Sequence, residues 1–133
     1  MTEICCHEKA GIGIAIVEDE KDLIKAYERM FTLSNICIAF VAYDGIDAVK
    51  KFVECTPKPH VVIMDYRMPI MNCIDAMKEM RKIDPDTKFI FLSADTSVKE
   101  EAVQAGATAF LIKPVRFKTI LDAVQRLLPK VTV

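Results

Sequence analysis

The stretch Val61-Val62-Ile63-Met64-Asp65 places four apolar residues directly before a carboxylate. A short, nearly continuous apolar run of this kind is typical of a strand that is buried on both faces of a parallel sheet. In parallel α/β sheets the ligand site is expected at the carboxyl ends of the strands. Asp65 is therefore the first candidate site residue.

Four further apolar runs resemble this one, and helical patterns with a period near 3.6 residues lie between them. The runs cover 12–17, 36–41, 89–92 and 109–112, and the helical patterns cover 23–31, 46–53, 76–83, 98–105 and 117–128. This alternation predicts an α/β fold of five βα units, with right-handed crossovers and helices on both faces of a parallel sheet. The boundaries agree, since Ser97 with Glu100 forms a capping-box pattern, Gly106 suits a helix end, and Asp84-Pro85-Asp86 suits a turn.

The composition indicates one globular domain. The chain has 133 residues, with 52% hydrophobic and 28% charged residues and a formal net charge of -1. A chain with this charge balance has no broad basic field that would attract nucleic acid, so we expect no nucleic-acid partner. No apolar run approaches the roughly 18 residues of a membrane span, so we expect no membrane association. We interpret residues 1–10 as an N-terminal arm and residues 11–133 as the domain.

The five cysteines form an odd set without a C-x-x-C pair: Cys5, Cys6, Cys37, Cys55 and Cys73. This pattern argues against a disulfide framework or a zinc cluster and favours a cytoplasmic protein. Cys5-Cys6-His7 is a candidate for binding a soft metal ion, but adjacent cysteines rarely both reach one ion. The alternative is an N-terminal arm whose cysteines are unpaired and bind no metal.

Charged and polar residues follow four of the five apolar runs. Glu18 and Asp19 follow the first, Asp65 the third, Ser93 the fourth and Lys113 the fifth. Because the carboxyl ends of parallel strands meet at one rim, these side chains are predicted to share one acidic pocket. Carboxylates that close repel one another, and a hard divalent cation such as Mg²⁺ would relieve the repulsion.

The remaining residue types suit phosphoryl chemistry. Lys113 could neutralise phosphate oxygens, Ser93 could donate a hydrogen bond to them, and the Asp65 carboxylate could act as a nucleophile toward phosphorus. Any single Asp after a strand is more often a helix cap or turn residue. The functional interpretation depends on the four positions taken together.

These residues resemble the receiver domain of two-component response regulators, including the stand-alone chemotaxis type. The similarity covers 13–128 and is carried by Val17-Glu18-Asp19, Met64-Asp65-Tyr66-Arg67-Met68-Pro69, Leu92-Ser93-Ala94 and Phe110-Leu111-Ile112-Lys113-Pro114. The resemblance implies a flavodoxin-like, doubly wound fold whose five parallel strands have the order 2-1-3-4-5, flanked by five helices.

The resemblance also implies roles for single residues. Asp65 would accept a phosphoryl group from a histidine kinase or a histidine phosphotransfer protein. Mg²⁺, which Mn²⁺ or Ca²⁺ could replace, would be held by Glu18 (through water), Asp19, Asp65 and the backbone carbonyl of Arg67. The phosphoryl oxygens would contact Ser93, the Ala94 backbone amide and Lys113, and the Lys113-Pro114 bond would be cis.

The family's output face corresponds here to residues 97–105, 109–112 and 116–128, which would bind a downstream protein. Phe110 is the expected aromatic switch beside Ser93, and a simple core position is an equal alternative. With about twenty residues after Lys113, we expect no attached effector domain, and no enzymatic activity beyond self-catalysed phosphorylation and slow dephosphorylation.

This chain departs from the family at Cys73, where a Gly is usual; a small apolar filler is favoured over a redox sensor. The positions of Arg67 and Asp95 flank the phosphorylation site and vary within the family. We hypothesise that these opposite charges approach each other and prolong the phosphorylated state.

Two rival functions are disfavoured by particular residues. An aspartate-nucleophile phosphatase needs a second Asp two residues after the first, where this chain has Arg67. A nucleotide- or flavin-binding module would need a glycine-rich phosphate loop after the first strand, where Glu18 and Asp19 stand instead.

Overall fold

The computed structural model describes residues 13–65 and 72–129. The predicted arm at 1–10, with the Cys5-Cys6-His7 candidate, and the predicted carbonyl ligand Arg67 lie outside the described residues. The predictions that concern them stay predictions.

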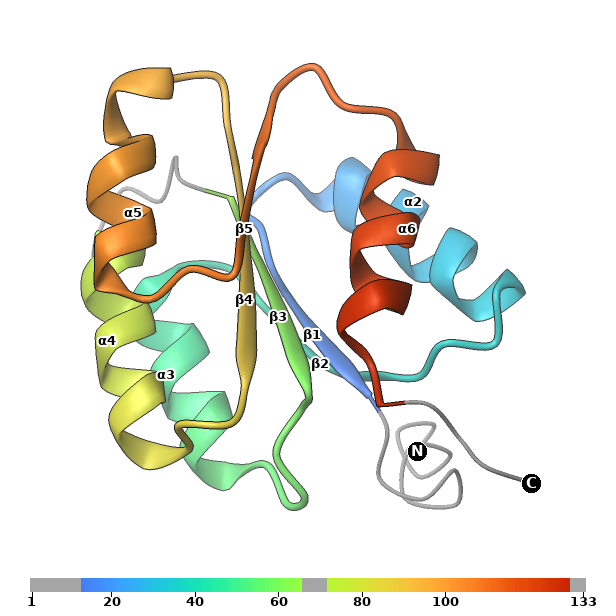
Figure 1. The fold of residues 1–133 in the computed structure, drawn as a ribbon. Coiled ribbons are helices and arrows are strands. Elements are labelled where there is room, and N and C mark those ends of the chain that lie inside the picture. The colour runs from blue at the N-terminus through green and yellow to red at the C-terminus, as the bar shows by residue number, and fades with distance from the viewer. Residues whose placement is uncertain (1–12, 66–71, 130–133) are drawn as a thin grey trace.

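The described residues form one parallel sheet with the strand order β2-β1-β3-β4-β5 (Figure 1). Its strands are β1 (Ile14–Val17), β2 (Ile38–Ala42), β3 (Val61–Asp65), β4 (Lys88–Ser93) and β5 (Ala109–Ile112). The predicted order is confirmed. Because β1 and β3 are neighbours at the centre, the residues that follow them are brought side by side.

Helices cover both faces of the sheet, as predicted. They are α2 (Lys21–Leu33), α3 (Gly45–Glu54), α4 (Cys73–Ile83), α5 (Lys99–Ala105), which follows the short 3₁₀ helix η2 (Thr96–Val98), and α6 (Phe117–Leu127). Figure 1 shows α3, α4 and α5 on one face and α2 and α6 on the other.

The central strands are buried on both faces, and their alternating side chains enter two separate cores. In β1, Ala15 and Val17 pack with α3 and α4, while Ile14 and Ile16 pack with α2 and α6. Because both faces of such a strand are buried, its sequence is a continuous run of apolar residues such as Val and Ile. The apolar runs therefore predicted the strands. This burial fixes the sheet rigidly and therefore the positions of its strand ends.

The helix ends and turns follow the predictions, with one exception. Gly106 ends α5 with a left-handed φ of 118°, and the Asp84 side chain accepts the Asp86 N–H at 3.0 Å in the predicted turn. The capping box at Ser97 is wrong: Ser97 lies inside η2, where its N–H is capped by Asp95. The 3₁₀ turn delays α5 to Lys99, which moves Ser97 away from a cap position.

The cysteines also correct an expectation. Cys37 is disulfide-bonded, which the odd cysteine count did not predict, while Cys55 and Cys73 form no disulfide. Across the described parts of the chain, no helix is both long and apolar enough to cross a membrane.

Candidate functional site

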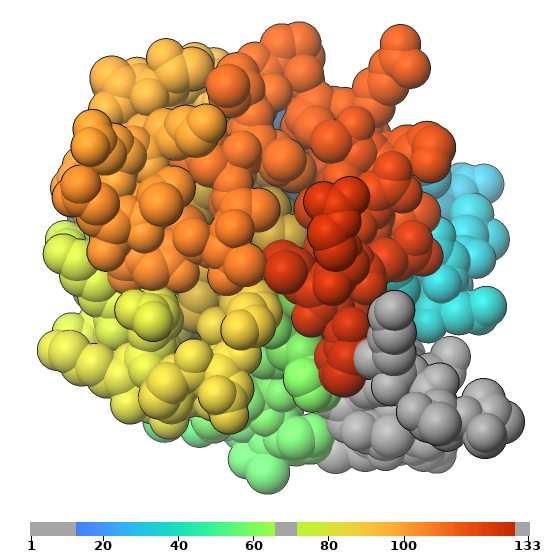
Figure 2. Space-filling view, viewed as in Figure 1, coloured from blue at the N-terminus to red at the C-terminus, as the bar shows by residue number. Residues whose placement is uncertain are grey.

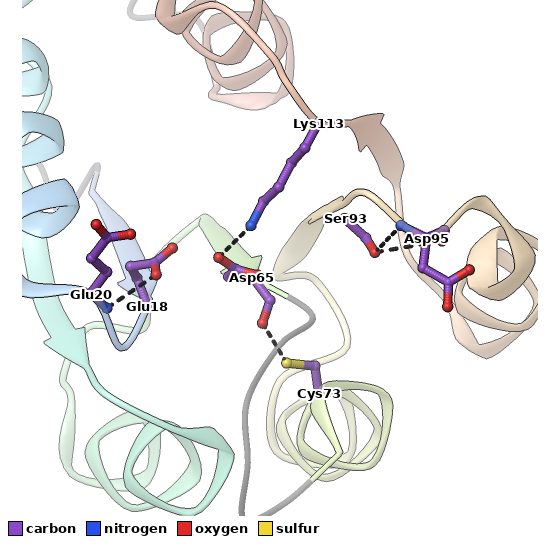
Figure 3. A network of polar contacts seen from close by, with 7 residues as sticks. All are labelled: Glu18, Glu20, Asp65, Cys73, Ser93, Asp95 and Lys113. Atoms are coloured by element: carbon purple, nitrogen blue, oxygen red, sulfur yellow. Dashed lines mark hydrogen bonds and ion pairs between the residues drawn. The ribbon is translucent and has the colours of Figure 1, made fainter.

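Asp65 ends β3 and is paired with Lys113. Its side chain is 1% exposed, and its Oδ2 lies 2.6 Å from the Lys113 Nζ (Figure 3). The lysine follows β5, and its backbone N–H donates to the Ser93 carbonyl at 3.0 Å, which anchors its stem to the end of β4. The Lys113 side chain is itself 22% exposed, so it lies between the buried carboxylate and solvent.

Glu18 follows β1 and places a second buried carboxyl beside Asp65 (Figure 3). Its Oε2 accepts the Glu20 backbone N–H at 3.1 Å, while its buried Oε1 has no hydrogen-bond partner among the residues that the structure describes. Burial, and next the hydrogen bond and the negative charge of Asp65, raise the pKa of Glu18 from 4.5 to about 8. A proton between the two carboxyls therefore stabilises this arrangement.

A cation would satisfy the same need as that proton. Lys113 supplies one positive charge against the two buried carboxyls, and the unpartnered Oε1 of Glu18 is the kind of hard oxygen that Mg²⁺ binds. The predicted third carboxylate, Asp19, is exposed. In the described segments, no group of three or more His, Cys, Asp or Glu is placed to hold a metal ion. The donors present fit a cation but do not enclose one.

Ser93 ends β4, but its hydroxyl is engaged with the following loop. The Oγ accepts the Asp95 N–H at 3.0 Å and lies 3.5 Å from the Asp95 carbonyl oxygen, and Figure 3 shows it on the side away from Asp65. Ala94 is exposed. The predicted convergence therefore holds for Glu18 and Lys113 around Asp65, while Ser93 lies at the rim with its side chain turned to its own loop.

Asp95 uses its carboxylate to hold η2. Its Oδ1 accepts the Ser97 N–H at 3.0 Å and the Ser97 hydroxyl at 2.6 Å. These hydrogen bonds lower the pKa of Asp95. The hypothesised pairing with Arg67 involves a residue outside the described ones and stays a hypothesis.

Two further predictions concern β5 and its end. The Lys113-Pro114 peptide bond is cis, as the resemblance implied, and a second cis bond, Thr56-Pro57, was not predicted. Phe110 is half-buried and packs against the core beneath α3, α4 and α5. This half-buried position fits both alternatives, the aromatic switch and the core position, so the switch stays a prediction.

Cys73 makes a contact that the sequence did not predict. The residue is fully buried, as expected for an apolar filler, but its thiol also donates to the Asp65 carbonyl oxygen at 2.8 Å. The departure from the family's usual Gly was the available signal, because a Gly cannot make a side-chain contact.

Comparison with known proteins relates this geometry to a family. The family model described as "Response regulator receiver domain" matches residues 14–125. Chemotaxis protein CheY of Thermotoga maritima is 36% identical over 118 residues, which cover 87% of this chain and 97% of the relative. Chemotaxis protein CheY of Bacillus subtilis is 32% identical over 117 residues, covering 86% and 96%.

Solved structures agree with the sequence relatives. A chain from the CheX-CheY-BeF₃-Mg²⁺ complex of Borrelia burgdorferi has a TM-score of 0.80 at 27% identity, covering 90% of this chain and 92% of that chain. Response regulator TrrA of Thermotoga maritima, in complex with Mg²⁺-BeF, has a TM-score of 0.75 at 26% identity and covers 86% and 96%.

Proposed function

Because the chain belongs to the response regulator receiver domain family and is a phosphorylation-dependent switch of two-component signalling, we propose that Asp65 is its phosphoacceptor. The donor is the phosphohistidine of a histidine kinase or of a histidine phosphotransfer protein. One carboxylate oxygen of Asp65 attacks phosphorus, the new O–P bond forms as the P–N bond breaks, and the imidazole leaves with the electron pair.

The observation that carries this proposal is the ion pair between Asp65 and Lys113 beside the unsatisfied Glu18 carboxyl. Phosphoryl transfer needs little from a protein except positioning and charge neutralisation. Lys113 supports the second of these, because its ammonium lies 2.6 Å from the Asp65 carboxylate oxygen. To accept a donor, this ammonium would move from the carboxylate oxygen to the phosphoryl oxygens, which the partial exposure of the Lys113 side chain permits.

Mg²⁺ belongs to the proposal as the cofactor that neutralises phosphoryl charge during transfer. Two similar structures are named as magnesium complexes, TrrA and the receiver domain of sensor histidine kinase PA1611. We assign the ion to Asp65 and Asp19, with Glu18 acting through water and the Arg67 carbonyl completing the protein ligands. Mn²⁺ or Ca²⁺ would replace it at the same oxygen donors.

The phosphoryl oxygens are assigned to Lys113, the Ser93 hydroxyl and the Ala94 backbone amide. For Ser93 this requires an exchange, since its hydroxyl now pairs with the Asp95 backbone. Breaking that contact would loosen the start of η2, which leads directly into α5. The phosphoryl group would thus favour a different arrangement of the loop after β4, with Phe110 turning inward as the second part of the switch.

The output partner is proposed to bind the face formed by α5, β5 and α6, which Figure 2 presents in orange to red. This face carries the exposed apolar side chains of Val103 and Ile112. An open hollow on α5 is lined by Thr96, Ser97, Lys99, Glu100, Val103 and Gln104. A similar CheY structure comes from a complex with CheX, so a protein partner is the expected occupant.

Two finer predictions complete the proposal. Arg67 and Asp95 are proposed to approach each other and prolong the phosphorylated state, and no turnover beyond self-dephosphorylation is expected. The protein is proposed to act in the cytoplasm, and the disulfide at Cys37 is the described feature against this, because disulfides are rare there. Thiol counting after acid trapping of intact cells tests that point.

The decisive experiment is incubation with acetyl phosphate and Mg²⁺, followed by intact mass measurement. Wild type should gain the mass of one phosphoryl group, and Asp65→Asn should gain none. Asp122→Asn is the matched control, because its carboxylate lies on α6 in an exposed pair with Lys118; it should label like wild type. An unlabelled wild type, or a labelled Asp65→Asn, would refute the assignment.

A further inference from the structure

Cys73 opens α4 directly against the proposed phosphoacceptor. The first turn of this helix is capped by Asn72, whose Oδ1 accepts the Ile74 N–H at 2.8 Å. Cys73 follows this cap, is fully buried, and directs its thiol to the Asp65 carbonyl oxygen at 2.8 Å (Figure 3). A helix start is thereby connected to the last residue of the central strand.

Asp65 is thus held at two of its groups. Lys113 holds the carboxylate, and the Cys73 thiol holds the carbonyl of the same residue. The position of a backbone carbonyl oxygen depends on both the φ and the ψ angle of its residue. Because the strand before Asp65 is fixed by pairing with β1 and β4, a change in the φ angle of Asp65 moves its carbonyl oxygen and its Cβ together. A contact that holds the oxygen therefore also restrains the carboxylate relative to Lys113 and Glu18.

We propose that Cys73 is a positioning residue for phosphoryl transfer: its thiol fixes the Asp65 peptide and so keeps the carboxylate in line with its donor. The inference rests on the proposed function of Asp65. Small errors of position are costly in such reactions, because reacting groups must be held within a fraction of an ångström of the productive geometry. The thiol acts through the backbone and does not touch the phosphoryl group.

A filler role and a positioning role predict opposite orders for two variants. If Cys73 only fills space, Ala is the milder change, because Ser brings a hydroxyl into an apolar core. If the hydrogen bond matters, Ser is the milder change for the reaction, because its hydroxyl can donate to the same carbonyl. The rate of phosphorylation, compared with thermal stability, separates the two roles.

The test measures the rate of mass gain with acetyl phosphate and Mg²⁺ over a range of donor concentrations. Cys73→Ala should lower the saturating rate by about three- to tenfold with an unchanged half-saturating concentration, and Cys73→Ser should stay within about twofold of wild type. Cys55→Ala is the matched control, since that thiol donates to the Pro57 carbonyl at 3.2 Å away from the site. Its rate should equal that of wild type.

Two results would overturn the inference: Cys73→Ala reacting as fast as wild type, or Cys73→Ser losing as much as Ala. If Cys73→Ala does not fold, Cys73→Gly, which carries the family's usual residue, is compared with Ser in the same way. Failure of wild type itself to gain mass would instead refute the proposed function. Independently of activity, the S–H stretching band in wild type minus Cys73→Ala infrared spectra should lie at the frequency of a hydrogen-bonded thiol; the frequency of a free thiol would contradict the contact.

Discussion

The two halves of the site differ in how well their polar groups are satisfied. Around β1 and β3, two buried carboxyls lie beside Lys113, and one oxygen of Glu18 has no hydrogen-bond partner within residues 13–65 and 72–129. Around the end of β4, Ser93 and Asp95 satisfy each other and the first turn of η2. The first half gains from an incoming cation or phosphoryl group, while the second must give up hydrogen bonds to receive one.

This difference separates binding from switching. A ligand can shift a conformational equilibrium only as far as it favours one arrangement over the other. The unsatisfied half supplies the favourable interactions with the ligand, and the satisfied half sets the cost of rearrangement. Variants of the two halves should therefore change different measurements, with the largest effects expected around Asp65.

Removing the lysine should have the largest effect. Lys113→Met leaves the buried Asp65 carboxyl without its cation, which should cost about 2 kcal/mol in urea unfolding and lower the rate of labelling by acetyl phosphate about 100-fold. In the double variant Asp65→Asn/Lys113→Met the charge is gone as well, so most of the lost stability should return. A double variant no more stable than Lys113→Met would mean that the charge imbalance is not the cause.

Glu18 should show the imbalance through pH. Its folded-state pKa of about 8 lies above the ordinary 4.5, so folding favours the protonated carboxyl. The stability contributed by this group is fully present below pH 4.5 and is lost as the pH rises through about 8. Glu18→Gln lacks this loss, and in EDTA at high pH its Tm should exceed that of wild type by roughly 4 °C.

Mg²⁺ provides the control for the Glu18 variant. If the carboxyl is destabilising because it lacks a counter-charge, adding Mg²⁺ should raise the Tm of wild type more than that of Glu18→Gln, and the two curves should converge. The same Tm difference at pH 5 and pH 9 would contradict the assigned cause.

The sequence predicted the half of the site that the sheet positions. The strand order places Glu18 beside Asp65, and the lysine after β5 reaches the same rim, where its Nζ lies 2.6 Å from the Asp65 Oδ2. These relations follow from the apolar runs and the parallel topology, which leave little freedom at a strand end.

Side-chain direction in the loops could not be predicted in the same way. Ser93 turns to Asp95 because a nearby backbone N–H competes for its hydroxyl, and Asp95 displaces the expected cap at Ser97. Asp19, one residue beyond Glu18, is exposed although both were placed in one pocket. Such choices depend on local hydrogen bonds of about 1 kcal/mol each, which residue types alone do not decide.

The smallest effect on stability, and the most specific on switching, is expected from Ser93→Ala. Without the hydroxyl, the Asp95 N–H can bond to water instead, since Asp95 is at the surface. The free energy of unfolding should therefore fall by no more than about 1 kcal/mol. Labelling at Asp65 should persist, because Lys113 and the carboxyls are untouched. In wild type, labelling should speed hydrogen exchange in η2 and α5 as Ser93 leaves Asp95; in Ser93→Ala that change should be absent. Asp95→Asn, which keeps an oxygen acceptor for Ser97, is the matched control and should retain the response to labelling. An undiminished response in Ser93→Ala would place the switch outside the half of the site formed by Ser93, Asp95 and η2.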